Sequence, residues 1–251
     1  LMTNNNIYFI ANWKMYGDLS SVNSIKKVIS LKKQKKFKQA KIIYCPPNII
    51  VNEFIKYTKY TNISVGSQDC YFIDGTGPYT GNISAYQLKK LGVNYVIAGH
   101  SEKRLDGDTD KVINKKVINI LSNNLQVILC VGESLKEKKN KKTLAVIRKQ
   151  LSTCLKKVKK SHKIIIAYEP IWSIGSGIIP SPKELDKTIK YINQFLSKKF
   201  KNNKSKILYG GSVNQKNINI LKNTKGIDGF LIGGASQTSN KFIDIIKKTI
   251  N

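Results

Sequence analysis

Residues 164–170 read Ile164-Ile165-Ile166-Ala167-Tyr168-Glu169-Pro170, an apolar run that ends at a carboxylate and a proline. A continuous apolar run of this kind is typical of a parallel strand that is covered on both faces. Comparable runs recur through the chain, each followed by polar residues. We therefore predict strands over residues 7–12, 41–45, 63–68, 95–99, 126–131, 164–168, 206–209 and 229–232.

Amphipathic segments separate these runs. Residues 21–36, 109–123 and 182–199 repeat apolar side chains at helical spacing, and Pro182 stands where a first helical turn favours proline. The repeated strand–helix unit shows no linker and no change of composition. It favours an α/β fold in which residues 1–251 form a single-domain (β/α)8 barrel. Periodicity alone does not exclude an open sheet of parallel strands.

Length and composition agree with one catalytic domain. A (β/α)8 barrel has about 250 residues, and this chain has 251, although two compact domains would also fit. No stretch approaches the roughly 20 apolar residues of a membrane-spanning helix. Residues 1–8 lack the apolar core of a signal peptide. We therefore expect a globular, cytoplasmic protein that makes no contact with a membrane.

Cysteine and histidine spacing gives no sign of a metal site. The four cysteines form no Cys-x-x-Cys pair, and neither His100 nor His162 stands at metal-ligand spacing from them. Buried or semi-buried free thiols are expected, without zinc or disulfides. The first predicted strand is followed by Asn12-Trp13-Lys14-Met15-Tyr16-Gly17, not by Gly-x-Gly-x-x-Gly, which disfavours a dinucleotide cofactor. No cofactor and no metal are expected.

The net charge of +29 raises the question of nucleic-acid binding. Arginine, the residue used most for phosphate and guanine recognition, occurs only as Arg104 and Arg148. Lysine, isoleucine and asparagine share A/T-rich codons, so a mutational bias of the genome accounts for composition and charge together. The charge still favours encounter with small anions. No nucleic-acid partner is expected.

Polar side chains follow the predicted strands at the edge where barrel enzymes build their active sites. Two glycine-rich turns, Gly210-Gly211-Ser212 and Gly233-Gly234, offer main-chain N–H groups to a phosphate. The loop from Glu169 to Pro182 is longer than most strand-to-helix loops and carries Gly175, which favours a mobile lid. The other polar residues at strand ends are Asn12, Lys14, His100, Glu102 and Glu133.

Several motifs resemble those of triosephosphate isomerases, in the order of that family. They are Asn12-Trp13-Lys14, Gly99-His100-Ser101-Glu102, Ala167-Tyr168-Glu169-Pro170-Ile171-Trp172-Ser173-Ile174-Gly175-Ser176-Gly177, Tyr209-Gly210-Gly211-Ser212-Val213 and Gly229-Phe230-Leu231-Ile232-Gly233-Gly234-Ala235. The resemblance covers nearly the whole chain. It implies a TIM barrel that interconverts dihydroxyacetone phosphate and D-glyceraldehyde 3-phosphate by proton transfer through an enediolate, in glycolysis and gluconeogenesis.

The resemblance implies a role for each matching residue. Glu169 is similar to the catalytic base, and Lys14 to the residue that supplies positive charge. His100 is similar to a neutral imidazole that polarises the substrate carbonyl, a role for which triosephosphate isomerase itself is the reference case. The remaining matches are Asn12 as a hydrogen-bond donor, Glu102 orienting Lys14, Cys130 as a packing neighbour, and Gly175, Ser212, Gly233 and Gly234 as a main-chain phosphate cradle.

The loop over residues 71–82 resembles the arm that inserts into a second subunit in this family. The resemblance implies a homodimer in which Thr80 supports the partner's active site; a surface loop without a partner is the alternative. Several residues depart from the family pattern. Lys103 replaces an arginine, Asp108 and Asn82 replace glutamates, and Ser173 and Ser176 stand where alanine and threonine are more frequent. A guanidinium lost at Lys103 bears on stability and dimer affinity more than on the chemistry.

Two other functions fit parts of the sequence. A different phosphate-binding barrel, such as a sugar-phosphate epimerase, would share the glycine-rich turns, but many of those use metals or paired acids that are not found at these strand ends. A basic nucleic-acid-binding protein on a barrel scaffold would explain the lysine excess. The spread of lysine along every predicted helix argues against a defined binding patch.

Overall fold

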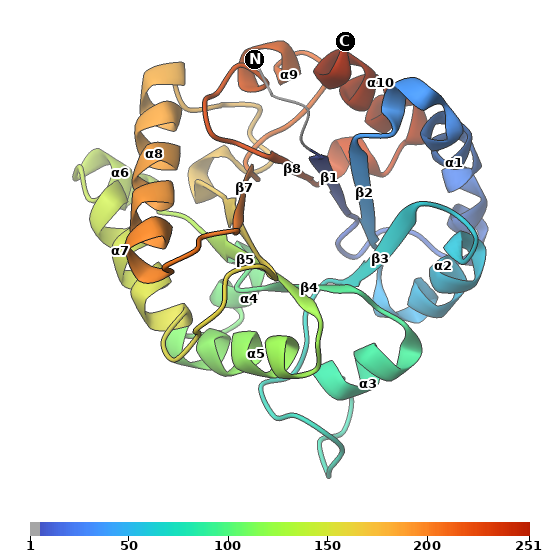
Figure 1. Ribbon diagram of the computed structural model, residues 1–251, viewed down its shortest axis with the longest axis horizontal. Helices are drawn as coiled ribbons and strands as arrows, with labels where there is room; N and C mark the ends of the chain where they lie inside the picture. The colour runs from blue at the N-terminus through green and yellow to red at the C-terminus, as the bar shows by residue number, and fades with distance from the viewer. Residues whose placement is uncertain (1–5) are drawn as a thin grey trace.

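Eight parallel strands close into a barrel in chain order, and helices surround it (Figure 1). The computed structural model describes residues 6–251, so the prediction for residues 1–8 lies largely outside the described residues. The barrel confirms the predicted fold class, and the predicted strand ends are correct to within one residue. The strands are β1 (Ile7–Asn12), β2 (Ala40–Cys45), β3 (Ile63–Ser67), β4 (Tyr95–Ala98), β5 (Gln126–Val131), β6 (Ile164–Tyr168), β7 (Lys206–Tyr209) and β8 (Gly229–Ile232).

The helices connect successive strands on the outside of the barrel. The α-helices are α1 (Lys26–Lys33), α2 (Val51–Thr58), α3 (Ala85–Leu91), α4 (Ser101–Leu105), α5 (Asp110–Ser122), α6 (Leu135–Lys139), α7 (Thr143–Cys154), α8 (Pro182–Lys199), α9 (Ile218–Leu221) and α10 (Ser239–Ile250). Short 3-10 helices are η1 (Leu19–Ile25), η2 (Lys35–Phe37), η3 (Asn48–Ile50), η4 (Ile171–Ser173) and η5 (Gly234–Ser236).

The first predicted helix, over residues 21–36, differs in part from the observed structure. Its beginning is the 3-10 helix η1, and only Lys26–Lys33 is α-helical. Serine and asparagine near its start compete for main-chain hydrogen bonds and are weak helix formers. Asp18 caps η1 through the N–H of Ser21. The predictions for 109–123 and 182–199 are confirmed, the former with its capping residues included.

Side chains of each strand alternate between two cores, one inside the barrel and one between strands and helices. On β6, Ile165 and Ala167 belong to the inner core, and Ile166 and Tyr168 pack on the helix side. The next inward position after Ala167 is Glu169. Strand periodicity therefore aims the Glu169 carboxylate into the mouth of the barrel.

All four cysteines are buried free thiols, as predicted. Within residues 6–251, no helix combines the length and the apolar character needed to cross a bilayer.

Candidate active site

A cavity of about 170 Å³ lies at the carboxyl ends of the strands. Most residues that the sequence predicted for the site line it together, although they come from strands far apart in the chain. Gly175 does not line the cavity; its neighbour Ile174 does. The predicted residues that line it are Asn12, Lys14, His100, Glu169, Ser212, Gly233 and Gly234.

Glu169 and His100 face each other across this cavity. The distance from Glu169 Oε1 to His100 Nε2 is 3.5 Å, and both side chains are almost fully buried. The other carboxylate oxygen, Oε2, is buried and makes no hydrogen bond to the residues described. Gly210 makes room for this carboxylate, because a Cβ there would lie 2.7 Å from Glu169 Cγ. A buried carboxylate with an unused oxygen suits proton transfer to a bound molecule.

The ring of His100 is oriented by the helix that follows it. His100 is the N-cap of α4, and its Nδ1 accepts a hydrogen bond from the N–H of Glu102 at 3.3 Å. In a neutral imidazole, a nitrogen that accepts leaves the hydrogen on the other nitrogen. Nε2–H is therefore the donor that faces Glu169 and the cavity.

Lys14 is held in a backbone conformation that is rare outside glycine. Its φ is 54°, a left-handed value that costs about 1 kcal/mol for an L-residue. The side-chain oxygen of Asn12 accepts from the Lys14 N–H at 3.1 Å, and Gln68 Nε2 donates to the Lys14 carbonyl at 2.7 Å. Lys14 Nζ lies 2.7 Å from a carboxylate oxygen of Glu102.

Gln68 is a site-supporting residue that the sequence analysis missed. The same amide nitrogen also donates to the carbonyl of Cys45 at 2.9 Å, so Gln68 ties the first loop to β2. A signal was present in the sequence, because Gln68 is a polar residue at the end of the third predicted strand. Only the hydrogen bond to the Lys14 carbonyl, 54 positions away in the sequence, shows that Gln68 supports the first loop.

Cys130 lies beneath the site and is not suited to nucleophilic attack. Burial, and then the neighbouring Glu169 carboxylate, raise the pKa of the Cys130 thiol well above its ordinary value. A neutral thiol is a poor nucleophile. Within the described residues, no cluster of three or more histidine, cysteine or acidic side chains is placed to hold a metal ion.

The base of the lid is fixed by Glu133. Trp172 Nε1 donates to one Glu133 oxygen at 2.9 Å, and the Tyr168 hydroxyl donates to the other at 3.1 Å. Further along the lid, Gly175 and Gly177 have φ values of +70° and +78°, which other residues rarely adopt. The lid thus has an anchored first half and a glycine-rich second half.

Two of the departures from the family pattern, Lys103 and Asp108, lie away from the cavity. Lys103 pairs with Asp106 at 2.9 Å near the surface. Arg104, which keeps its guanidinium, donates to Asp110 at 2.6 Å and to the carbonyls of Gly99 and Cys130. Asp108 reaches the buried Lys116 at 2.6 Å. None of these side chains lines the cavity.

The loop over residues 71–82 projects from the barrel between β3 and α3 (Figure 1). Helix α5 supports its base: Lys116 pairs with Asp69 at 2.8 Å, and Asn119 Nδ2 donates to the carbonyl of Phe72 at 3.0 Å. Beyond this base, residues 76–82 are exposed, including Thr80. Helix α5 therefore holds the base of the loop, and the tip of the loop is exposed.

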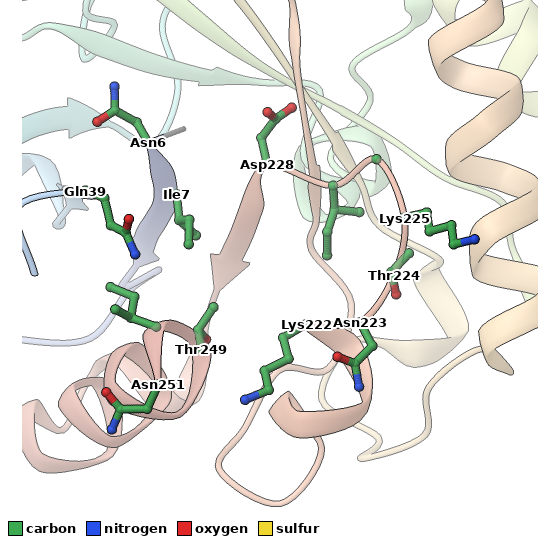
Figure 2. A pocket seen from close by; sticks show the side chains of 13 residues that line it. Asn6, Ile7, Gln39, Lys222, Asn223, Thr224, Lys225, Asp228, Thr249 and Asn251 are labelled. Carbon is green, nitrogen blue, oxygen red and sulfur yellow. The ribbon is translucent and has the colours of Figure 1, made fainter. Parts of the chain in front are cut away.

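A larger cavity of about 770 Å³ lies at the opposite, amino-terminal end of the strands (Figure 2). Its lining comes from the start of β1, the α9–β8 connection and the end of α10. Asp228 already accepts from Lys206 Nζ at 2.9 Å and from the N–H of Ile207, and Lys222 donates to a main-chain carbonyl at 2.6 Å. Lys222 and Lys225 point in different directions (Figure 2). No group of catalytic residues converges there within the described chain.

Comparison with known proteins agrees with the geometry at the carboxyl end. The sequence model of the triosephosphate isomerase family matches residues 7–249. The triosephosphate isomerase of Thermoanaerobacter pseudethanolicus is 39% identical over 241 residues, which cover 94% of this chain and 96% of the relative. That of the yeast Zygosaccharomyces bailii is 38% identical over 239 residues, covering 94% and 95%.

A solved structure shows the same likeness in three dimensions. The crystal structure of triosephosphate isomerase from Bartonella henselae superposes with a TM-score of 0.88 at 32% identity, covering 97% of this chain and 98% of that one. The family model, the length of the chain and the geometry of the cavity all agree with membership of this family. The chain belongs to the triosephosphate isomerase family.

Proposed function

We propose that Glu169, His100 and Lys14 carry out the triosephosphate isomerase activity of this chain, the glycolytic interconversion of dihydroxyacetone phosphate and glyceraldehyde 3-phosphate. The observation that carries this assignment is the 3.5 Å approach of the buried Glu169 carboxylate to His100 Nε2 in one cavity. A base and a hydrogen-bond donor at this spacing can act on adjacent carbon and oxygen atoms of a small substrate.

Glu169 removes a proton from the carbon beside the carbonyl and returns it to the neighbouring carbon. The electron pair of the broken C–H bond forms a carbon–carbon double bond, and the carbonyl oxygen becomes negative. His100 Nε2–H donates to that oxygen, and the Lys14 ammonium stabilises the enediolate. The proton of the neighbouring hydroxyl passes to the former carbonyl oxygen, so that the new carbonyl forms as the carbon next to it is protonated. Glu102, 2.7 Å from Lys14 Nζ, holds the ammonium in position. Each proton removed is returned, so no redox partner is needed.

The phosphate is assigned to the main-chain N–H groups of Ser212, Gly233 and Gly234. These residues line the same cavity as Glu169, and glycine-rich turns can bring bare N–H groups close to an anion. Gly175 would join them when the lid closes. Asn12 is assigned to the substrate as a further polar contact.

A direct assay tests this assignment. Chelator-treated protein is mixed with glyceraldehyde 3-phosphate, and the appearance of dihydroxyacetone phosphate is followed. Glu169→Gln keeps the shape of the side chain but removes the base, so turnover should fall by about 10²-fold or more. Glu53→Gln, an exposed carboxylate on α2, is the matched control. Equal turnover in the two variants would remove Glu169 from the mechanism.

We also propose a homodimer formed through residues 71–82. The exposed tip of this loop supports it, as do Met15, Tyr16 and Ile49, which are 94%, 59% and 80% exposed. Large apolar side chains exposed on loops of neighbouring strands are typical of a surface that another chain covers. A cytoplasmic location is proposed on the four buried free thiols, which suit a reducing compartment; cell fractionation tests it.

A further inference from the structure

One buried hydroxyl joins the lid to the barrel, that of Ser173 at the end of η4. Ser173 is fully buried. Its Oγ lies 2.9 Å from the Tyr209 hydroxyl and 3.1 Å from the main-chain nitrogen of Ser212. It also lies 2.5 Å from the carbonyl oxygen of Ile178. These partners belong to β7, to the turn after β7 and to the second half of the lid.

The hydrogen-bonding capacity of this hydroxyl is filled. A serine hydroxyl has one hydrogen and two lone pairs. The hydrogen goes to the carbonyl of Ile178, and the lone pairs accept from the Tyr209 O–H and the Ser212 N–H. Because a buried polar group that loses its partner is costly, this arrangement favours one position of the lid against the β7 turn.

The β7 turn makes room for these contacts. A Cβ at Gly211 would lie 2.6 Å from Ser173 Oγ and would collide with the Tyr209 hydroxyl. The other lid serine behaves differently: Ser176 Oγ donates to the carbonyl of Ser173 at 3.0 Å and accepts from the Ile178 N–H at 3.2 Å. Ser176 therefore bonds within the lid, whereas Ser173 bonds from the lid to the barrel.

We propose that Ser173 is a positioning residue that latches the lid to the β7 turn by occupying the Ser212 N–H, and that a bound phosphate releases this latch. The inference rests on the proposed function, which assigns the Ser212 N–H to the substrate phosphate. One N–H makes one strong linear hydrogen bond, so Ser173 Oγ and a phosphate oxygen compete for it. The latched position is one in which Ile174, and not Gly175, lines the cavity.

The latch itself is tested without any ligand. Amide hydrogen exchange is measured at Ser212 in the ligand-free protein, in the wild type, Ser173→Ala and Ser176→Ala. Loss of the acceptor should speed exchange at Ser212 by about threefold to tenfold in Ser173→Ala, whereas Ser176→Ala should match the wild type. Unchanged exchange in Ser173→Ala overturns the latch, whatever the site binds.

Release by phosphate is tested by calorimetric titration with inorganic phosphate. Ser173→Ala should bind phosphate about threefold to tenfold more tightly, because the Ser212 N–H no longer has to leave an internal partner. Structural damage would weaken binding, so the direction separates the two explanations. Circular dichroism confirms that the variant is folded. Equal or weaker binding overturns the release. Failure of wild type and variant alike to bind phosphate, with Ser212 exchange still different, rejects the phosphate site and leaves the hydrogen bond established.

Discussion

The two ends of the barrel each carry a cavity, and the smaller one is the proposed active site. The cavity at the amino-terminal end, about 770 Å³, is several times larger than the one of about 170 Å³ at the carboxyl end. At the larger cavity, charged groups such as Asp228 are paired with their own neighbours. At the smaller one, Glu169 keeps a carboxylate oxygen without a partner in the described chain. Volume therefore says less about function than the convergence of unsatisfied reactive groups.

The origin of this difference is the direction of the strands. All the strands are parallel, so their carboxyl ends meet at one rim. The side chains just beyond those ends, such as His100 and Glu169, are brought together at this rim. Helix ends and short turns lie at the opposite rim. They stabilise the fold but do not bring reactive side chains together.

The largest expected effect comes from shortening the base at the carboxyl end. Glu169→Asp withdraws the carboxylate by about 1 Å, which should lower kcat by about 10²-fold. Asp228→Asn changes a carboxylate at the other end and should leave kcat unchanged. Steady-state kinetics on both folded variants give the comparison. If kcat fell as much in Asp228→Asn as in Glu169→Asp, the proposed functional difference between the two ends would be wrong.

Removal of residues 76–80 should have the next largest effect. Without the exposed tip the chain should be monomeric, and kcat should fall by about tenfold or more, since small displacements of catalytic groups are costly. Analytical ultracentrifugation gives the mass, and the isomerase assay gives the rate. A fully active monomer would show that the carboxyl-end site is complete within one chain.

Gln68→Ala tests how the active end is supported. This change removes two hydrogen bonds that hold the Lys14 loop. Because each bond contributes about one kcal/mol or less, kcat/KM should fall by about tenfold. Gln39→Ala removes an amide that lines the larger cavity and is the matched control. Kinetics and thermal melting are measured for both. Equal kcat/KM values would mean that Gln68 only adds stability.

The smallest expected effect concerns helix caps. Helix α8 begins at the carboxyl end of the barrel with Ser181 and Glu184 bonded to each other and to the main chain, and it ends with Lys198 and Lys199. Hydrogen bonds from the Ser181 N–H and hydroxyl lower the pKa of Glu184. Its ionised form therefore stabilises the folded state above its ordinary pKa of about 4.5, and that contribution disappears as pH falls through the lowered value.

At pH 7, Glu184→Gln should lower the free energy of unfolding by less than about 1 kcal/mol, because the Glu184 side chain is largely exposed. The melting temperature should therefore fall only slightly. The difference from the wild type should shrink as pH falls below about 4.5 and through the lowered pKa of Glu184. Melting curves at a series of pH values below 7 provide the check. A difference that grows on acidification would contradict the sign of the pKa change.

The sequence alone predicted the positions of the strands, because a buried parallel strand consists of a continuous apolar run. Residues 164–168 illustrate this, since the observed β6 has the predicted bounds. The same periodicity places Glu169 on the inward face. The helix over residues 21–36 was less well predicted because its serines and asparagines favour tighter turns.

Local patterns and the family resemblance thus determined the barrel, the rim that carries the chemistry and the identity of the polar residues on that rim. Tertiary structure alone decided which atoms meet: Gln68 with the Lys14 carbonyl, and Ser173 with Tyr209 and Ser212. The physical reason is range. Periodicity reports on neighbours a few positions apart, whereas these hydrogen bonds join residues 36 to 54 positions apart and exist only once the barrel has closed.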